Sequence, residues 1–121
     1  MWKLNSDKPI FLQIAEGIED AILSGAFKEE EQIPSTNEIS AEYRINPATA
    51  LKGVNILVDE EILYKKRGIG MFVTKGATKI IARKRSQRFF EDYVSNLIAE
   101  AKKLDLSKED IIAMLERGFK Q

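Results

Sequence analysis

Apolar residues recur every three or four positions over residues 9–24, which is the spacing of one face of an amphipathic helix. Pro9 suits a first helical turn, and Gly25 suits a left-handed helix end. We therefore expect an amphipathic first helix that begins at Pro9 and has one apolar stripe. The stripe consists of Ile10, Ile14, Ile18, Ala21 and Ile22.

Two short helices with capping signals follow in tandem. Ser35 and Glu38 are spaced as a capping box, which predicts a helix over residues 35–43. An N-cap asparagine at Asn46, followed by a proline, predicts a third helix that starts at residue 47 and ends near residue 59. Because only about three residues join the two helices, they should cross steeply, as in a helix-turn-helix. The third helix should bury Ala50, Leu51, Val54, Leu57 and Val58 and expose Ala48, Thr49, Lys52 and Asn55.

Two β-prone runs, residues 62–65 and 71–74, flank a glycine-containing turn and predict a β-hairpin. The glycines also have a purely structural explanation, since a turn often needs a positive φ. The tip also has three consecutive cations, and a partner or water must offset the repulsion between them. The residues of this tip that we single out are Lys65, Lys66, Arg67, Gly68 and Gly70.

Residues 79–104 have the pattern of one long helix, and Ser107 with Asp110 caps a last helix after a break at Asp105. One apolar stripe on each helix is too little for an independent core. These helices should pack on the preceding domain, on a second copy of the chain, or on both, and we favour dimerisation. The expected interface residues are Phe90, Tyr93, Val94, Leu97, Ala101, Leu104, Ile111, Met114 and Leu115.

The order of elements predicts a mainly α fold with a small β-hairpin (α+β). Helix, turn, helix and basic hairpin are the outline of a winged helix-turn-helix, which presents one helix and one hairpin to a nucleic-acid duplex. We expect a winged helix-turn-helix DNA-binding domain over residues 1–76 and a helical dimerisation region over residues 77–121.

The composition narrows the chemistry. The 121 residues include no cysteine and no histidine, which removes thiol nucleophiles, imidazole bases and the usual zinc ligands. We therefore expect no enzyme, no cofactor and no metal, and we interpret the acidic run Glu29–Glu31 as a solvated turn. No apolar run is long enough to span a bilayer, and residues 1–8 lack the apolar segment of a signal peptide, so the expected location is the cytoplasm.

Charge is distributed unevenly although it sums to zero, with 19 basic and 19 acidic residues. The segment from residue 62 to residue 90 has nine basic residues and no acidic one. Such local asymmetry creates a positive surface on a neutral chain. A solvated face that binds nothing is the alternative, and the position of the segment on and after the hairpin favours nucleic acid.

Five stretches, taken in order, resemble the motifs of one family of bacterial transcription regulators, the GntR family. They are Pro9–Ile14 (P-x-Y-x-Q-I in the family), Ile18–Gly25 (I-x-x-A-I-x-x-G), Ile33–Ser40 (L-P-S-x-R-x-L-A), Asn46–Lys52 (N-P-N-T-V-x-K) and Arg67–Val73 (R-G-x-G-T-F-V). The asparagine–proline start of the third helix and the short C-terminal part resemble the YtrA subfamily. Asn37 stands where the family usually has arginine, and Met71 where it has threonine.

The resemblance implies a DNA-binding transcription regulator, specifically a repressor that binds an inverted-repeat operator as a homodimer. It also leaves room for a small-molecule effector between the winged domain and the tail helices or at the dimer seam. The alternative is a winged-helix module that binds an acidic protein and no DNA.

Three parts of the chain are the candidate DNA contacts. The start of the third helix should enter the major groove, the amides that begin the second helix should bind a phosphate, and the hairpin should approach the backbone. Capping alone also explains Asn46, and a solvated charge also explains Lys52 and Arg67. The candidates outside the hairpin are Ser35, Thr36, Asn37, Arg44, Asn46, Pro47, Ala48, Thr49 and Lys52.

Overall fold

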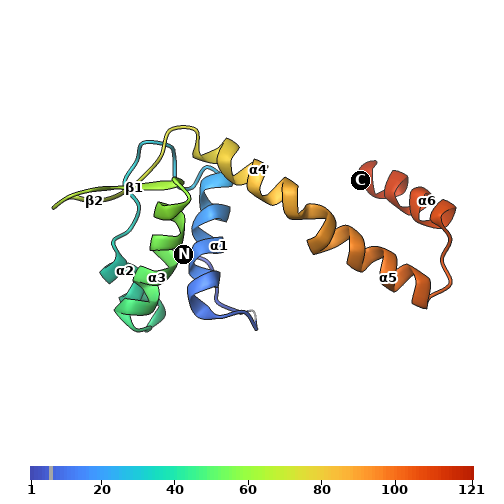
Figure 1. The fold of residues 1–121 in the computed structure, drawn as a ribbon, viewed down its shortest axis with the longest axis horizontal. Coiled ribbons are helices and arrows are strands. Elements are labelled where there is room, and N and C mark those ends of the chain that lie inside the picture. The colour runs from blue at the N-terminus through green and yellow to red at the C-terminus, as the bar shows by residue number, and fades with distance from the viewer. Residues whose placement is uncertain (6) are drawn as a thin grey trace. The chain divides into compact units, whose positions relative to one another are not determined.

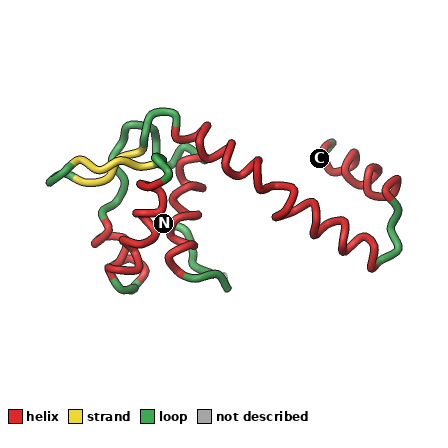
Figure 2. The backbone as a smooth tube through the Cα atoms, in the orientation of Figure 1, coloured by secondary structure: helices red, strands yellow, loops and turns green. Residues whose placement is uncertain are grey.

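A computed structural model describes residues 1–5 and 7–121 as helices with one two-stranded sheet (Figure 1). The chain divides into two compact units, Met1–Ala82 and Arg83–Gln121, and each is described by itself. The elements are α1 (Ile10–Leu23), α2 (Thr36–Tyr43), α3 (Pro47–Asp59), β1 (Leu63–Lys66), β2 (Gly70–Val73), α4 (Ala77–Phe89), the π-helical segment η1 (Phe90–Val94), α5 (Ser95–Lys103) and α6 (Lys108–Phe119). Figure 2 colours these helices red and the two strands yellow.

The fold class and the order of elements confirm the sequence-based expectation. The boundaries of α2 and α3 lie where their capping signals place them, with Ser35 and Asn46 as N-caps. Pro9 is the N-cap of α1 and lies one residue before the helix, a small difference from the expected start. Gly25 has a φ of +85°, the left-handed conformation expected after α1. The strands are each displaced by one residue toward the hairpin tip.

The core of the first unit forms where α1 packs on α3, which lie side by side in Figure 1. Gly53 makes this close approach possible, because a Cβ atom there would lie 2.6 Å from the carbonyl oxygen of Phe11 and 3.0 Å from Ile14. The largest side chains that are fully buried around this contact and beneath the hairpin are Ile14, Ile18, Ile39, Leu57, Ile62, Leu63, Ile81, Val54 and Val73.

Leu51 is exposed, and its expected burial was wrong. Its side chain is 43% exposed, whereas Ala50 and Val54 are fully covered. The reason is helical geometry: α1 approaches α3 along the line that includes Ala50 and Gly53, and Leu51 is turned about 100° from Ala50. Val58, also expected in the core, is half-buried.

The N-terminal residues add an aromatic cluster that the sequence pattern did not indicate. Trp2 packs on Gly17, where a Cβ atom would collide with the indole ring. Its ring lies 5.7 Å from that of Tyr43 and 6.5 Å from that of Phe27, measured between centroids. The hydroxyl of Tyr43 donates a hydrogen bond to the carbonyl of Trp2. The segment before α1 therefore joins α1 to the end of α2.

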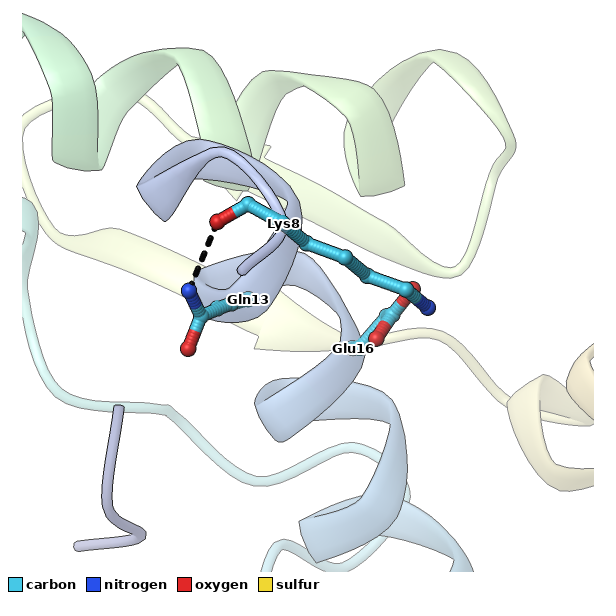
Figure 3. Close-up of polar contacts among 3 residues, drawn as sticks. All are labelled: Lys8, Gln13 and Glu16. Carbon is cyan, nitrogen blue, oxygen red and sulfur yellow. Dashed lines mark hydrogen bonds and ion pairs between the residues drawn. The ribbon is translucent and has the colours of Figure 1, made fainter. Parts of the chain in front are cut away.

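Polar contacts hold the start of α1 (Figure 3). The Nε2 atom of Gln13 donates a hydrogen bond of 2.8 Å to the carbonyl oxygen of Lys8, which closes the segment before the helix. The ammonium of Lys8 lies 2.9 Å from Oε1 of Glu16. These contacts give the glutamine of the first motif a structural role.

The acidic turn after α1 is bonded rather than merely solvated. Oε1 of Glu29 accepts a hydrogen bond of 2.9 Å from the amide of Gly76, and Oε2 accepts one of 3.3 Å from Thr78. A carboxylate placed there satisfies amides at the N-terminus of α4 and complements the helix dipole. Ala77 and Ile81 are buried in the same unit, so the compact unit extends into α4, past the expected boundary at residue 76.

The second unit contains the end of α4, then η1, α5 and α6. No non-helical residue separates α4, η1 and α5, in agreement with one long helix over residues 79–104, although the π-helical turn was not foreseen. Ser107 and Asp110 form the expected capping box of α6. Among the described residues, no helix combines the length and apolar character that crossing a membrane requires. Within residues 1–5 and 7–121, no cluster of His, Cys, Asp or Glu is arranged to hold a metal ion.

Gly53→Ala should destabilise the protein by about 1–3 kcal/mol, because the added methyl group meets backbone and cannot be relieved by a side-chain rotation. Urea unfolding of the full chain measures this loss. Gly118→Ala in α6 is the matched control: a Cβ atom there has nothing within 4 Å, so helix propensity should make it neutral or stabilising by up to about 1 kcal/mol. Equal effects of the two substitutions would contradict the close approach at Gly53.

Glu29→Gln should lower the melting temperature near neutral pH, and the difference should shrink in acid. Hydrogen bonds from the backbone of Gly76 and then of Thr78 lower the pKa of Glu29 below its usual 4.5. A carboxyl group with a depressed pKa in the folded chain stabilises it above the unfolded pKa, and this stabilisation disappears as pH falls through the folded pKa. Thermal unfolding at about pH 7 and about pH 3 tests this, with Glu31→Gln as the control. A gap that stays constant with pH would exclude a charged cap.

Candidate nucleic-acid interface

Helix α2 begins with amides that are only partly used within the chain. The amide of Glu38 donates 3.0 Å to Oγ of Ser35, and the amide of Ser35 donates 3.2 Å to the carboxylate of Glu38. Helix geometry leaves the first amides, those of Thr36 and Asn37, without an intrahelical acceptor. They can bind a phosphate, although the carboxylate of Glu38 at the same helix end opposes an anion.

The turn between α2 and α3 is short and tightly bonded. Arg44 takes the left-handed conformation, with a φ of 53°, and its side chain is exposed. The amide of Ile45 donates 3.1 Å to the carbonyl of Ser40, and the hydroxyl of Ser40 donates 3.0 Å back to the carbonyl of Ile45. This double contact fixes the direction in which α3 leaves the turn.

Helix α3 exposes most of the residues expected to read bases. Oδ1 of Asn46 accepts a hydrogen bond of 2.8 Å from the amide of Ala48, so this side chain acts as a cap. Pro47, Ala48 and Lys52 are exposed, and Thr49 is half-buried. Leu51 joins this exposed side, contrary to expectation. A surface of small, apolar and cationic side chains suits base edges and thymine methyl groups.

Lys52 has a partner that the sequence did not suggest. Its Nζ atom lies 4.0 Å from the centroid of the Phe11 ring, within the roughly 6 Å range of a cation–π contact. Phe11 lies at the start of α1 and is half-buried. The candidate cation on α3 therefore contacts an aromatic ring of a different helix, 41 residues earlier in the chain.

The hairpin is antiparallel, with Lys66 opposite Gly70 and a short loop at residues 67–69. Gly68 and Gly70 have φ values of +77° and +150°, which L side chains rarely adopt, so the tip requires them. Lys65, Lys66 and Arg67 are all exposed. The tip thus presents cations and bare backbone together.

The segment between α1 and α2 supports this hairpin along one edge. Nε2 of Gln32 donates 3.0 Å to the carbonyl of Ile69 at the tip, and the amide of Ile33 donates 3.0 Å to Met71. The amide of Glu30 donates 2.7 Å to the carbonyl of Val73. Neither Gln32 nor this edge was foreseen, because contacts between distant segments leave no local pattern.

Aromatic rings of the two strands lie against one of the cations of the hairpin. The rings of Tyr64 and Phe72 stack with centroids 5.7 Å apart, and Nζ of Lys66 lies 4.3 Å above the Phe72 ring. The hydroxyl of Tyr64 donates 3.0 Å to Glu30. Met71, which departs from the family motif, is 9% exposed and packs in the core. It therefore acts in packing at this position.

All the DNA-contact candidates lie in the first unit, in which α3 contacts both α2 and β1. The interface candidates of the second unit fall into two groups. Phe90, Tyr93, Leu97, Leu104, Met114 and Leu115 are exposed, whereas Val94 and Ile111 are half-buried and Ala101 is 7% exposed. Four further apolar side chains outside the expected interface set are also exposed: Phe89, Ile98, Ile112 and Phe119.

Comparison with known proteins finds a matching family and similar solved structures. The family model described as "Bacterial regulatory proteins, gntR family" matches residues 11–73. A GntR-family regulator from Bacteroides thetaiotaomicron is 34% identical, with a TM-score of 0.75 over 92% of this chain and 96% of that one. YtrA from Sulfolobus acidocaldarius, 24% identical with a TM-score of 0.54 over 99% and 96% of the two chains, shows the same fold.

A third similar structure contains DNA. The DNA-binding domain of AraR in complex with operator ORX1 is 28% identical, with a TM-score of 0.54 over 61% of this chain and 92% of that one. The chain spans only 25–28% of the length of three curated relatives that it matches, two of which are transcriptional repressors by name.

Proposed function

The chain belongs to the gntR family of bacterial regulatory proteins, and we propose that it is a DNA-binding transcription regulator that represses transcription as a homodimer on an inverted-repeat operator. Membership of this family confirms the expectation that the chain is not an enzyme. A small-molecule effector and a cytoplasmic location belong to the same proposal. The names of repressors among the relatives support the direction of control.

The observations that carry the DNA-binding surface are the exposed start of α3 and the supported cationic hairpin, which lie in the same compact unit. Base contacts fall to Ala48, Thr49 and Lys52 in the major groove, where lysine can donate to guanine and an alanine or threonine methyl can pack on thymine. Arg44, the start of α2 and the hairpin tip bind phosphates, which set register and affinity. A module that binds an acidic protein instead would use the same cations, and it predicts no sequence preference among duplexes.

The homodimer is supported by the exposed apolar side chains of α5 and α6. Leu97, Leu104 and Phe119 are 41%, 61% and 89% exposed. Water contact with so many large apolar groups is unfavourable, and a second copy that presents the same face removes it. Ala101, already covered within the chain, contributes little to this interface. A two-fold dimer would place two winged domains on half-sites about 34–36 Å apart.

Arg67→Ala and Lys52→Ala should separate phosphate contact from base contact. Arg67→Ala should weaken binding to all duplexes alike and reduce the salt slope by about 1, whereas Lys52→Ala should also relax sequence preference. Titrations at two salt concentrations would compare a duplex selected by the wild-type chain from a random pool with a scrambled one. Lys108→Ala in α6 is the control for loss of one positive charge. Unchanged affinity in both test variants would refute the assigned surface.

Leu97→Glu should convert a dimer into monomers, because it places a charge in the centre of the proposed apolar interface. Sedimentation equilibrium of the full chain measures the change as a rise of the dimer dissociation constant by at least about tenfold, equivalent to 1.4 kcal/mol. Ala99→Glu adds the same charge about 200° around α5 and should leave the association unchanged. A wild-type chain that is monomeric at micromolar concentration would contradict the proposal directly.

A further inference from the structure

We propose that Phe11 is a positioning residue for DNA recognition: its ring holds the ammonium of Lys52 ready for contact with the duplex. The inference rests on the proposed reading role of Lys52 and deepens it, since it assigns a function to a residue of α1 that lies outside the helix-turn-helix and the hairpin.

The geometry of the contact is that of a cation–π pair. Nζ of Lys52 lies 4.0 Å from the centroid of the Phe11 ring. The face of an aromatic ring carries the negative part of its quadrupole, which attracts an ammonium group. Phe11 is half-buried while Lys52 is exposed, so the ring is the fixed member of the pair and the lysine is the member that it restrains.

The backbone around Phe11 is itself fixed against α3. Gly53, the neighbour of Lys52, allows the carbonyl oxygen of Phe11 to lie where a side chain at residue 53 would collide with it. Two residues after Phe11, Gln13 ties the start of α1 to the carbonyl of Lys8 (Figure 3). The ring therefore comes to Lys52 through packing of α1 on α3.

The Phe11 ring restrains the lysine side chain and leaves its charge and its hydrogen-bond donors available. An acidic partner would neutralise the ammonium and accept its protons, whereas a phenyl ring has no hydrogen-bonding atom, so the ammonium keeps its charge and its three donors. A lysine side chain that is free in solution must lose many rotamers when it binds, and restraint before binding lowers that entropic cost. The contact thus favours association with a base edge or phosphate.

The test is a double-mutant cycle on the full-length chain. The probe is a duplex that the wild-type chain selects from a random-sequence pool, and a scrambled duplex is the reference. Phe11→Leu, which keeps an apolar side chain and removes the ring, should weaken binding to the selected duplex about two- to five-fold. Phe11→Tyr, which keeps the ring, should retain wild-type affinity. In a Lys52→Met background, Phe11→Leu should have no further effect on affinity.

Two results would overturn the proposal. One is an equal loss from Phe11→Leu with and without Lys52, which would mean that Phe11 acts on the fold alone. The other is tighter binding by Phe11→Leu, which would mean that the ring withholds the lysine from DNA.

The contact between Lys52 and Phe11 can also be measured directly in the wild-type chain. The Cε protons of Lys52 should show an upfield ring-current shift in the NMR spectrum of the wild-type chain, and a random-coil shift would refute the contact. Failure of the proposed function would look different, since the wild-type chain would then enrich no duplex from the pool.

Discussion

The close approach of α1 and α3 at Gly53 is the constraint on which the DNA-binding unit depends. It places the backbone of Phe11 against α3 and covers Ile14 and Val54. Interiors are packed so densely that one methyl group added at such a contact would force the neighbouring atoms to move. The same contact decides which side of α3 is covered, and hence which side is left for DNA. Gly53 therefore affects both the packing of α1 on α3 and the choice of the α3 face that is exposed to DNA.

Local signals made much of the fold predictable from the sequence. The capping box at Ser35, the Asn46 cap and the Gly25 stop each act within one helical turn, so the sequence alone specifies them. Leu51, Glu29 and the ring beneath Lys52 could not be predicted, because their environments depend on segments far away in the chain. Periodicity gives the width of an apolar stripe and not the direction from which the neighbouring helix approaches.

The hairpin illustrates the same distinction at the site. Its strands and glycines were predictable, but an isolated two-stranded hairpin is only marginally stable in water. Here residues 30–33 run along β2 and bond to it, and the Gln32 side chain reaches the tip. The connection between α1 and α2, whose acidic run Glu29–Glu31 has the sequence of a solvated turn, thus holds the hairpin to the core. A segment with exposed acidic side chains can therefore also support the hairpin through its backbone.

A chain with no net charge can present a positive surface because its charged residues are unevenly distributed along the sequence. Several acidic side chains are occupied within the fold: Glu29 caps α4, Glu30 accepts from Tyr64, and Glu38 closes its capping box. Lys52 and Lys66, in contrast, rest on aromatic rings, which orient a cation and leave its charge intact. Net charge therefore says little about a partner. What matters is whether each cation is held by an acid, which cancels it, or by a ring, which does not.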